Sequence, residues 1–145
     1  MKLQKSTSIA LCSVLEAASD PSRQISASEI VAKYGVSAHH LAKVLRQLSR
    51  SGFVESTRGA GGGYRFIGNA KRLTLYDVIE VFEDVTARSA EGGDSEYGTD
   101  VGMAIALVLR EIDETSRATF RSITISTMLK MIARAKNQSA GLARS

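Results

Sequence analysis

Four glycines occupy positions 59, 61, 62 and 63 of this chain, and an aromatic residue, Tyr64, follows them directly. A cluster of this density lets the backbone adopt left-handed conformations and turn sharply. Two short helical patterns joined by a tight turn precede the cluster, and strand-like runs at 53–57 and 64–66 flank it. Helix, turn, helix, strand, glycine hairpin, strand is the order of a winged helix-turn-helix. We therefore expect a mainly α fold with a small β-wing.

The helices before the glycine cluster have clear start and stop signals. A first helical pattern of apolar residues runs from Ile9 to Ala18. Ser26 and Glu29 then have the spacing of a capping box, and Gly35 is a suitable C-terminal cap. Ser37 is a good N-cap for the next helix. The buried face of that helix is predicted to carry Leu41, Val44, Leu45 and Leu48.

The opposite face of the helix that Ser37 caps is polar, rich in hydrogen-bond donors and free of carboxylates. Its residues are Ala38, His39, Ala42, Lys43, Arg46, Gln47 and Arg50. Helix-turn-helix proteins place such a face in the major groove of DNA. A face that is merely solvated remains the alternative, although it would usually mix acids with bases. The pattern favours DNA.

Arg58 stands at the start of the glycine loop. An arginine beside glycines at the base of a wing is predicted to contact a phosphate or the minor groove; bracing of the wing is the alternative. The loop lacks the Lys-Ser/Thr pair of a P-loop and the last glycine of a dinucleotide fingerprint. Since no nucleophile–base–acid pattern occurs elsewhere, we do not expect an enzyme.

Charge is divided unevenly along the 145 residues. Residues 1–72 hold 11 Lys/Arg and 4 Asp/Glu, a net charge of +7, whereas residues 73–145 hold 8 and 11, a net charge of −3. The basic half contains the helix-turn-helix pattern, which favours a polyanionic partner there. A solvated basic surface is the alternative.

Cysteine content and hydropathy indicate a cytoplasmic protein without membrane contact. The single cysteine, Cys12, excludes an internal disulfide and fits a reducing compartment. The N-terminus lacks the apolar core of a signal peptide, and the longest apolar stretch, 101–109, is too short to span a membrane.

The second half predicts helices that extend beyond the winged domain. Thr74 and Asp77 have capping-box spacing, residues 85–99 read as a flexible sensor-type loop, and Thr99 or Asp100 caps a long helix through about Thr119. The apolar stripe of that helix is wider than one small domain needs, which implies a partner helix. The expected organisation is a winged helix-turn-helix domain over 1–84, the loop over 85–99, a dimerisation helix and a C-terminal helix over 100–136, and a disordered tail over 137–145.

Several motifs occur together in a specific order. They are Ser37-x-x-His40-Leu41, Gly52-Phe53-Val54, Ser56-x-Arg58-Gly59-x-x-Gly62-Gly63-Tyr64 and Leu73-Thr74-Leu75-x-Asp77-Val78-Ile79. With them the chain resembles the Rrf-type bacterial transcription regulators, the family of IscR, NsrR, RirA and CymR. The resemblance runs to about Asp84 and continues more weakly to about Ile132.

This resemblance implies a homodimeric repressor or activator, with a repressor favoured, that binds double-stranded DNA at a pseudo-palindromic operator. The long helix would cross its symmetry mate, and two recognition helices would enter successive major grooves. Taken with the polar helix face, the predicted DNA-contacting residues are Ser37, His39, His40, Lys43, Arg46, Gln47, Arg58, Gly59, Gly61, Gly62, Gly63 and Tyr64, with Lys2 and Lys5 at phosphates.

Two departures from the family pattern bear on function. The tyrosine expected at the position of His40 is replaced, so a phenolic phosphate contact becomes an imidazole contact. The three cysteines that hold an iron–sulfur cluster in many members are absent from 88–100. Because such clusters require thiolates, we expect no cluster, and we predict no other cofactor.

Weaker site hypotheses remain beside the DNA-binding one. His39 and His40 are not expected to form a metal site, since adjacent helical positions do not face each other. Cys12 is expected to pack in the core, as a lone cysteine in an apolar helix usually does. A redox role of its thiol is the alternative. Two other functions stay open: a protein-interaction adaptor, and a regulator that responds to a small-molecule or protein effector. The sequence names neither signal nor operator.

Overall fold

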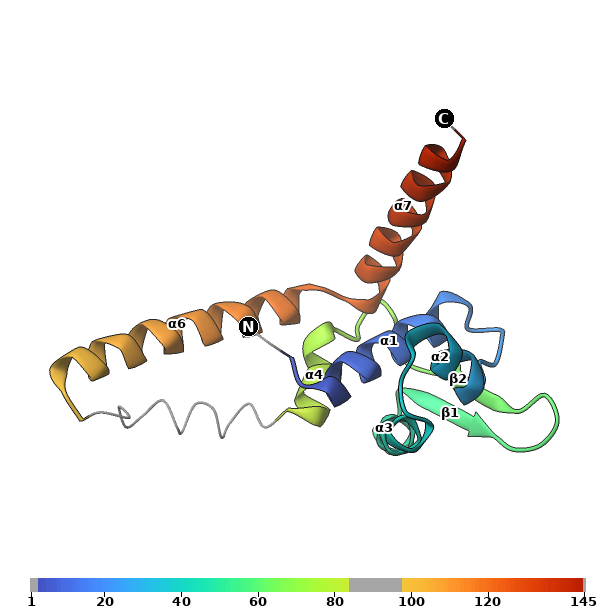
Figure 1. Cartoon of the computed structure of the whole chain (residues 1–145), viewed down its shortest axis with the longest axis horizontal. Helices are drawn as coiled ribbons and strands as arrows, with labels where there is room; N and C mark the ends of the chain where they lie inside the picture. Colours follow the sequence, from blue (N-terminus) through green and yellow to red (C-terminus); the bar gives the residue numbers. More distant parts are fainter. Residues whose placement is uncertain (1–2, 84–97, 145) are drawn as a thin grey trace.

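The computed structural model describes residues 3–83 and 98–144, and it has the expected mainly helical architecture with a two-stranded wing (Figure 1). Helices α1 (Lys5–Ser19), α2 (Ala27–Tyr34) and α3 (Ala38–Arg50) are followed by strands β1 (Val54–Thr57) and β2 (Gly63–Phe66) and by helix α4 (Leu75–Phe82). Two longer helices, α6 (Asp100–Ser122) and α7 (Ile125–Ala143), extend away from this winged domain in different directions (Figure 1).

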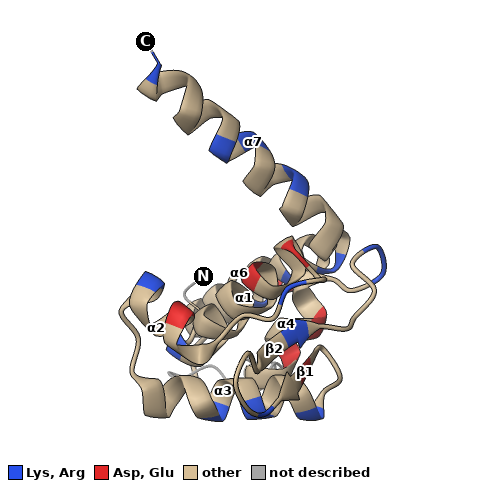
Figure 2. Cartoon of the chain, turned by 90° about the vertical axis from the view of Figure 1, so that its right-hand side faces the viewer, with Lys and Arg blue, Asp and Glu red and all other residues tan. Residues whose placement is uncertain are grey.

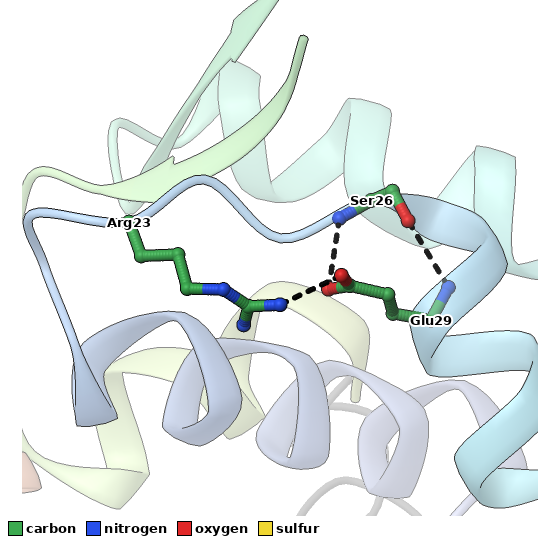
Figure 3. A network of polar contacts seen from close by, with 3 residues as sticks. All are labelled: Arg23, Ser26 and Glu29. Carbon is green, nitrogen blue, oxygen red and sulfur yellow. Dashed lines mark hydrogen bonds and ion pairs between the residues drawn. The ribbon is translucent and has the colours of Figure 1, made fainter. Parts of the chain in front are cut away.

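Local capping fixes where α2 begins and ends. The Ser26 hydroxyl accepts a hydrogen bond from the Glu29 amide at 3.2 Å, and the Glu29 carboxylate accepts one from the Ser26 amide at 3.4 Å. Arg23 adds a 2.7 Å ion pair to the same carboxylate (Figure 3). Gly35 then ends the helix with φ of 63°, which favours glycine. The predicted capping box and C-terminal cap are confirmed.

The core of the winged domain lies around α1, which contacts α3, α4, α7 and β2. Helix α3 contributes the four apolar residues predicted from its periodicity, and each is at most 2 % exposed. Full burial of one such side chain stabilises a fold by roughly 1.5–3 kcal/mol. The core residues that pack with them from α1 are Ile9, Ala10, Val14, Ala17 and Ala18.

The wing is an antiparallel hairpin in which Val54 pairs with Phe66 and Thr57 pairs with Gly63. Ile25 adds a short third strand, because its amide and carbonyl both bond to Tyr64 at 2.8 Å. A Cβ atom on Gly63 would lie only 2.6 Å from the Ile25 carbonyl oxygen, so this glycine permits a close backbone approach. Part of the glycine cluster is therefore required by the fold itself.

The start of α7 is built into the winged domain. The Leu75 amide donates to the Ile123 carbonyl at 2.9 Å, and the Ile125 amide donates to the Leu73 carbonyl at 2.8 Å. Ile125 is fully buried in the same core as α1 and α3. The Arg121 guanidinium also lies over the Tyr76 ring, 4.2 Å from its centre. The sequence assigned residues 100–136 to a separate unit, yet Ile125 within that range lies in the core of the winged domain.

Two boundaries of the C-terminal helices differ from the prediction. Helix α6 starts at the predicted Thr99 cap but continues to Ser122. Helix α7 continues to Ala143, so the disordered tail predicted over 137–145 is wrong for most of its length. This segment has no proline, and alanine, glutamine and leucine are good helix formers. The predicted loop over 85–99 lies outside the described residues except for Gly98 and Thr99.

Candidate nucleic-acid interface

Helix α3 presents its polar face outward. The Ser37 hydroxyl caps the helix by accepting a hydrogen bond from the His40 amide at 3.3 Å. With one side of the helix buried, the residues left exposed are Ala38, His39, Ala42, Lys43, Arg46, Gln47 and Arg50. Figure 2 shows Lys and Arg along the outer side of α3, with no acidic residue in the helix. The face therefore carries positive charge from Lys43 to Arg50 and no negative charge.

The N-terminal end of α3 adds to this positive potential. Backbone amides at a helix start have no partner within the helix and carry a partial positive charge. Ser37 and His39 stand exposed at that end. Helix N-termini bind phosphate for this reason. Both residues are therefore accessible to an anionic partner, and their contact with DNA stays a prediction.

Two residues predicted to contact DNA also form hydrogen bonds within the chain. His40 is half-buried, and its Nε2 lies 2.8 Å from the Ser6 hydroxyl of α1. Gln47 is exposed, and its Nε2 donates to the Val81 carbonyl of α4 at 2.9 Å. Both contacts join residues 34 positions apart, so no local pattern in the sequence signals Ser6 or Val81 as partners.

The wing divides into an exposed tip and a half-buried base. Arg58, Gly59, Ala60 and Gly61 are exposed, and Gly59 has φ of 102°. The predicted contact residues Gly62, Gly63 and Tyr64 are half-buried instead, and the last two lie in β2 against Ile25. The tip is therefore the part of the glycine cluster that the fold leaves accessible to a partner.

The basic residue Lys5 lies close to the start of α3. Lys5 is exposed at the first position of α1. It lines a cavity of about 230 Å³ together with Val36, which directly precedes the Ser37 cap. A phosphate contact by Lys5 near this end of α3 stays a prediction. Lys2 lies outside the described residues.

Cys12 is half-buried on α1 and lines the same cavity. Burial raises the pKa of its thiol, the negative charge of Glu16 raises it further, and Lys33 opposes the change. Because the thiolate is the reactive form, this environment favours an unreactive thiol. The local chemistry therefore supports packing more than redox sensing.

Two negative findings apply to the described residues. No three His, Cys, Asp or Glu side chains gather there in a group that could hold a metal ion. Within the same ranges, 3–83 and 98–144, no helix is long and apolar enough to cross a membrane.

Comparison with known proteins relates most of the chain to one family. The family model described as "Rrf2: Iron-dependent Transcriptional regulator" matches residues 3–131. The chain is 49% identical over 132 residues to the HTH-type transcriptional regulator BadM of Rhodopseudomonas palustris, covering 91% of this chain and 83% of that protein. It is 31% identical to protein aau3 of Rhizobium meliloti, with 90% and 86% of the two chains covered.

Solved structures support the same fold. The IscR structure from T. potens matches with a TM-score of 0.72 at 23% identity, covering 93% of this chain and 90% of that one. The oxidized form of CymR from Staphylococcus aureus matches with a TM-score of 0.73 at 21% identity, covering 89% and 96%. At these identities the likeness concerns the fold alone.

Proposed function

The chain belongs to the Rrf2 family of transcriptional regulators, and from this premise we propose that it is a homodimeric repressor of a pseudo-palindromic operator. The family prediction made from the sequence motifs is confirmed. Members of this family are transcriptional regulators rather than enzymes, so DNA is the partner of this chain. The repressor role, the homodimer and a cytoplasmic location are our proposal.

The observation that carries the proposal is the outward face of α3, which has no acidic residue. The exposed tip of the wing provides a second accessible surface. Lys43 and Arg46 project from this face, and Arg58 stands on the wing. A recognition helix of this kind enters the major groove with its N-terminal residues toward the bases. We assign phosphate or minor-groove contact to Arg58, Gly59 and Gly61 of the wing.

Helix α6 supports the homodimer. Seven of its large apolar side chains are between 51% and 71% exposed: Val101, Met103, Ile105, Leu107, Val108, Leu109 and Ile112. At helical spacing Val101, Ile105, Val108, Leu109 and Ile112 form one stripe about 100° wide, and Met103 and Leu107 lie on the other side of the helix. An apolar stripe of this width on a helix normally faces a packing partner. We infer that a second copy of the chain covers it, which would set two recognition helices about one turn of DNA, roughly 34 Å, apart.

The family description names iron, so the donor residues of this chain decide whether an iron–sulfur cluster fits. Cysteine thiolates hold such clusters. The sequence contains only Cys12, on α1, and the segment 88–100 contains none. One half-buried thiol cannot supply three ligands, so the residues do not fit a cluster of the family's usual kind. We propose that this regulator works without one and responds to an effector of another kind.

Selection of binding sites from random duplex DNA tests the main proposal. The wild-type chain should enrich a sequence with two related half-sites, whereas a protein-interaction adaptor would enrich no motif. If about 6–10 phosphates are contacted, affinity for the enriched site should fall roughly 10³- to 10⁵-fold between 50 and 200 mM salt. Affinity that does not change with salt would count against binding through the cationic face.

Two further measurements separate the finer parts of the proposal. A reporter gene placed behind the enriched site should be silenced by the chain if it is a repressor and raised if it is an activator. Protein purified without oxygen should lack stoichiometric iron and sulfide. Finding both at cluster stoichiometry would overturn the cluster-free assignment.

A further inference from the structure

We propose that His40 and Gln47 are positioning residues, which fix the recognition helix α3 on α1 and α4, while His39, Lys43 and Arg46 read or neutralise the DNA. This inference rests on the proposed function, because it concerns how the helix is presented to DNA. It also narrows the set of residues predicted from the sequence, in which all five were DNA contacts.

Helical spacing separates the two groups of residues on α3. His39, Lys43, Arg46 and Arg50 follow the spacing i, i+4, i+7, i+11, so they form one row along the helix. All four are exposed. His40 and Gln47 are seven positions apart and share the next row, about 100° away around the helix. One row therefore faces outward, and its neighbour borders the rest of the domain.

The first contact of the bordering row is made by His40. Its Nε2 lies 2.8 Å from the Ser6 hydroxyl in the first turn of α1, and both residues are half-buried. His39, by contrast, is exposed. Adjacent positions in the sequence thus have different surroundings, since one imidazole turns toward α1 and the other toward solvent.

The second contact is made by Gln47 at the other end of the helix. Its Nε2 donates at 2.9 Å to the carbonyl of Val81 in the last turn of α4. The last four carbonyls of a helix have no amide partner within it, so this bond supplies a donor that α4 itself cannot. A glutamine that reads adenine must offer Oε1 and Nε2 together. Here Nε2 is held by α4.

The two elements that hold α3 are themselves joined by Glu83. Its buried carboxylate accepts hydrogen bonds from the Gln4 amide at 2.8 Å and from the Thr7 hydroxyl at 3.1 Å. Glu83 follows the end of α4, and Gln4 and Thr7 flank the start of α1. The start of α1 and the end of α4 are thereby fixed to each other, and together they set the angle of α3.

A double-mutant cycle with base profiling tests this inference. The probe is the duplex that the wild-type chain enriches from random DNA, together with single-base variants of it. Ser6→Ala and His40→Ala should each weaken binding about three- to tenfold, the loss expected for one hydrogen bond. The double variant should bind no more weakly than the weaker single variant, because both remove the same contact. Gln47→Ala should lose a similar factor.

The readout specific to positioning is the base preference of the variants. All three single variants should weaken every duplex by the same factor and keep the wild-type order of preference. Ser6→Thr should restore affinity because it keeps the hydroxyl. Ser8→Ala on α1 and Gln138→Ala on α7 are matched controls that should bind like the wild type.

Several outcomes would overturn the inference. A loss of preference at one base pair in Gln47→Ala or His40→Ala would make that residue a base reader. Unchanged affinity in folded Ser6→Ala, with only a lower Tm, would make its bond purely structural. If His40→Ala does not fold, His40→Asn replaces it and is judged by the same criteria. If the wild type enriches no duplex, the proposed function fails and this inference fails with it, whereas the outcomes above leave the proposed function intact.

Discussion

Helices α3 and α6 bury their apolar residues to very different extents within one chain. In α3, Leu41, Val44, Leu45 and Leu48 are at most 2% exposed, and the polar side faces solvent. In α6, the seven large apolar side chains between Val101 and Ile112 leave more than half of their surface exposed. The recognition helix is therefore fully supported by its own chain, whereas α6 is supported mainly near its C-terminal end.

This difference shows which parts of the molecule depend on association. The winged domain gains its stability from a core that α1, α3, α4 and the start of α7 complete together. Apolar surface on α6 gains free energy only when another molecule removes it from water. The surfaces that we propose for DNA reading and for dimerisation are thus separate, and substitutions should affect one without the other.

The largest effect on operator affinity is expected when charged residues are placed on α6. Val108→Glu combined with Ile112→Glu places two carboxylates in the proposed dimer interface, and the chain should become monomeric. Operator affinity should then fall about 10²- to 10⁴-fold, because linked half-sites no longer bind together. Sedimentation measures the oligomeric state, and titration of the enriched duplex measures affinity.

Ala133→Glu with Ala140→Glu adds the same charge to the exposed part of α7. This control pair should leave the dimer and its affinity intact. A dimeric Val108→Glu/Ile112→Glu variant would show that α6 is not the interface, and the contrast between the two helices would lose its explanation.

A core substitution should affect stability in a different manner. Leu45→Ala removes a side chain that is 1% exposed and should cost about 2–5 kcal/mol in the free energy of unfolding. Leu109→Ala on α6 should instead lower stability by an amount that depends on protein concentration, since only the proposed dimer would bury that residue. Urea unfolding at several protein concentrations distinguishes the two. Concentration dependence in Leu45→Ala but not in Leu109→Ala would reverse the assignment of the two surfaces.

A substitution in the wing should change operator affinity less, and the same hairpin provides a control residue. Arg65 forms a 3.2 Å ion pair with Glu55, whereas Arg58 stands exposed at the start of the tip. Arg58→Ala should weaken operator binding about tenfold and reduce the salt slope by about one. Arg65→Ala should change affinity less than twofold, because exposed ion pairs contribute little. Equal losses in both variants would remove Arg58 from the DNA contact.

The elements of the winged domain could be predicted because their signals are local. Ser26, Ser37 and Thr74 cap their helices as their spacing predicted, since a capping bond joins residues only three positions apart. The buried side of α3 followed from its period. The family motifs identified the order of the elements because each motif is also a short, local run of residues.

The contacts that fix the recognition helix could not be predicted in this way. Ser6 meets His40, and Val81 meets Gln47, only after α1 and α4 have packed beneath α3. The pairing of Ile25 with Tyr64 and the anchoring of Ile125 likewise depend on packing. From sequence, His40 and Gln47 could not be told apart from His39, Lys43 and Arg46, because a polar side chain that bonds within the chain looks like one left free for a partner.

The smallest predicted effect concerns Glu16, which joins α1 to α2 by accepting hydrogen bonds from the side chains of Lys33 and Tyr34. Burial of the carboxyl disfavours its charged form, but the hydrogen bonds from Lys33 and Tyr34 outweigh this, so the pKa of Glu16 is lowered below 4.5. A carboxyl whose pKa is depressed by folding stabilises the fold above its unfolded pKa. That contribution is lost as the pH falls through the folded value.

Glu16→Gln should therefore lower the free energy of unfolding by about 1 kcal/mol at pH 7. The difference from the wild type should shrink as the pH falls below 4.5, the ordinary value for this carboxyl. Urea unfolding between pH 7 and pH 3 measures it, with Glu55→Gln on the exposed wing as a control that should change little. Because Glu16 lies within one chain, the loss should not vary with protein concentration. A difference that stays constant down to pH 3 would mean that shape, rather than charge, makes Glu16 stabilising.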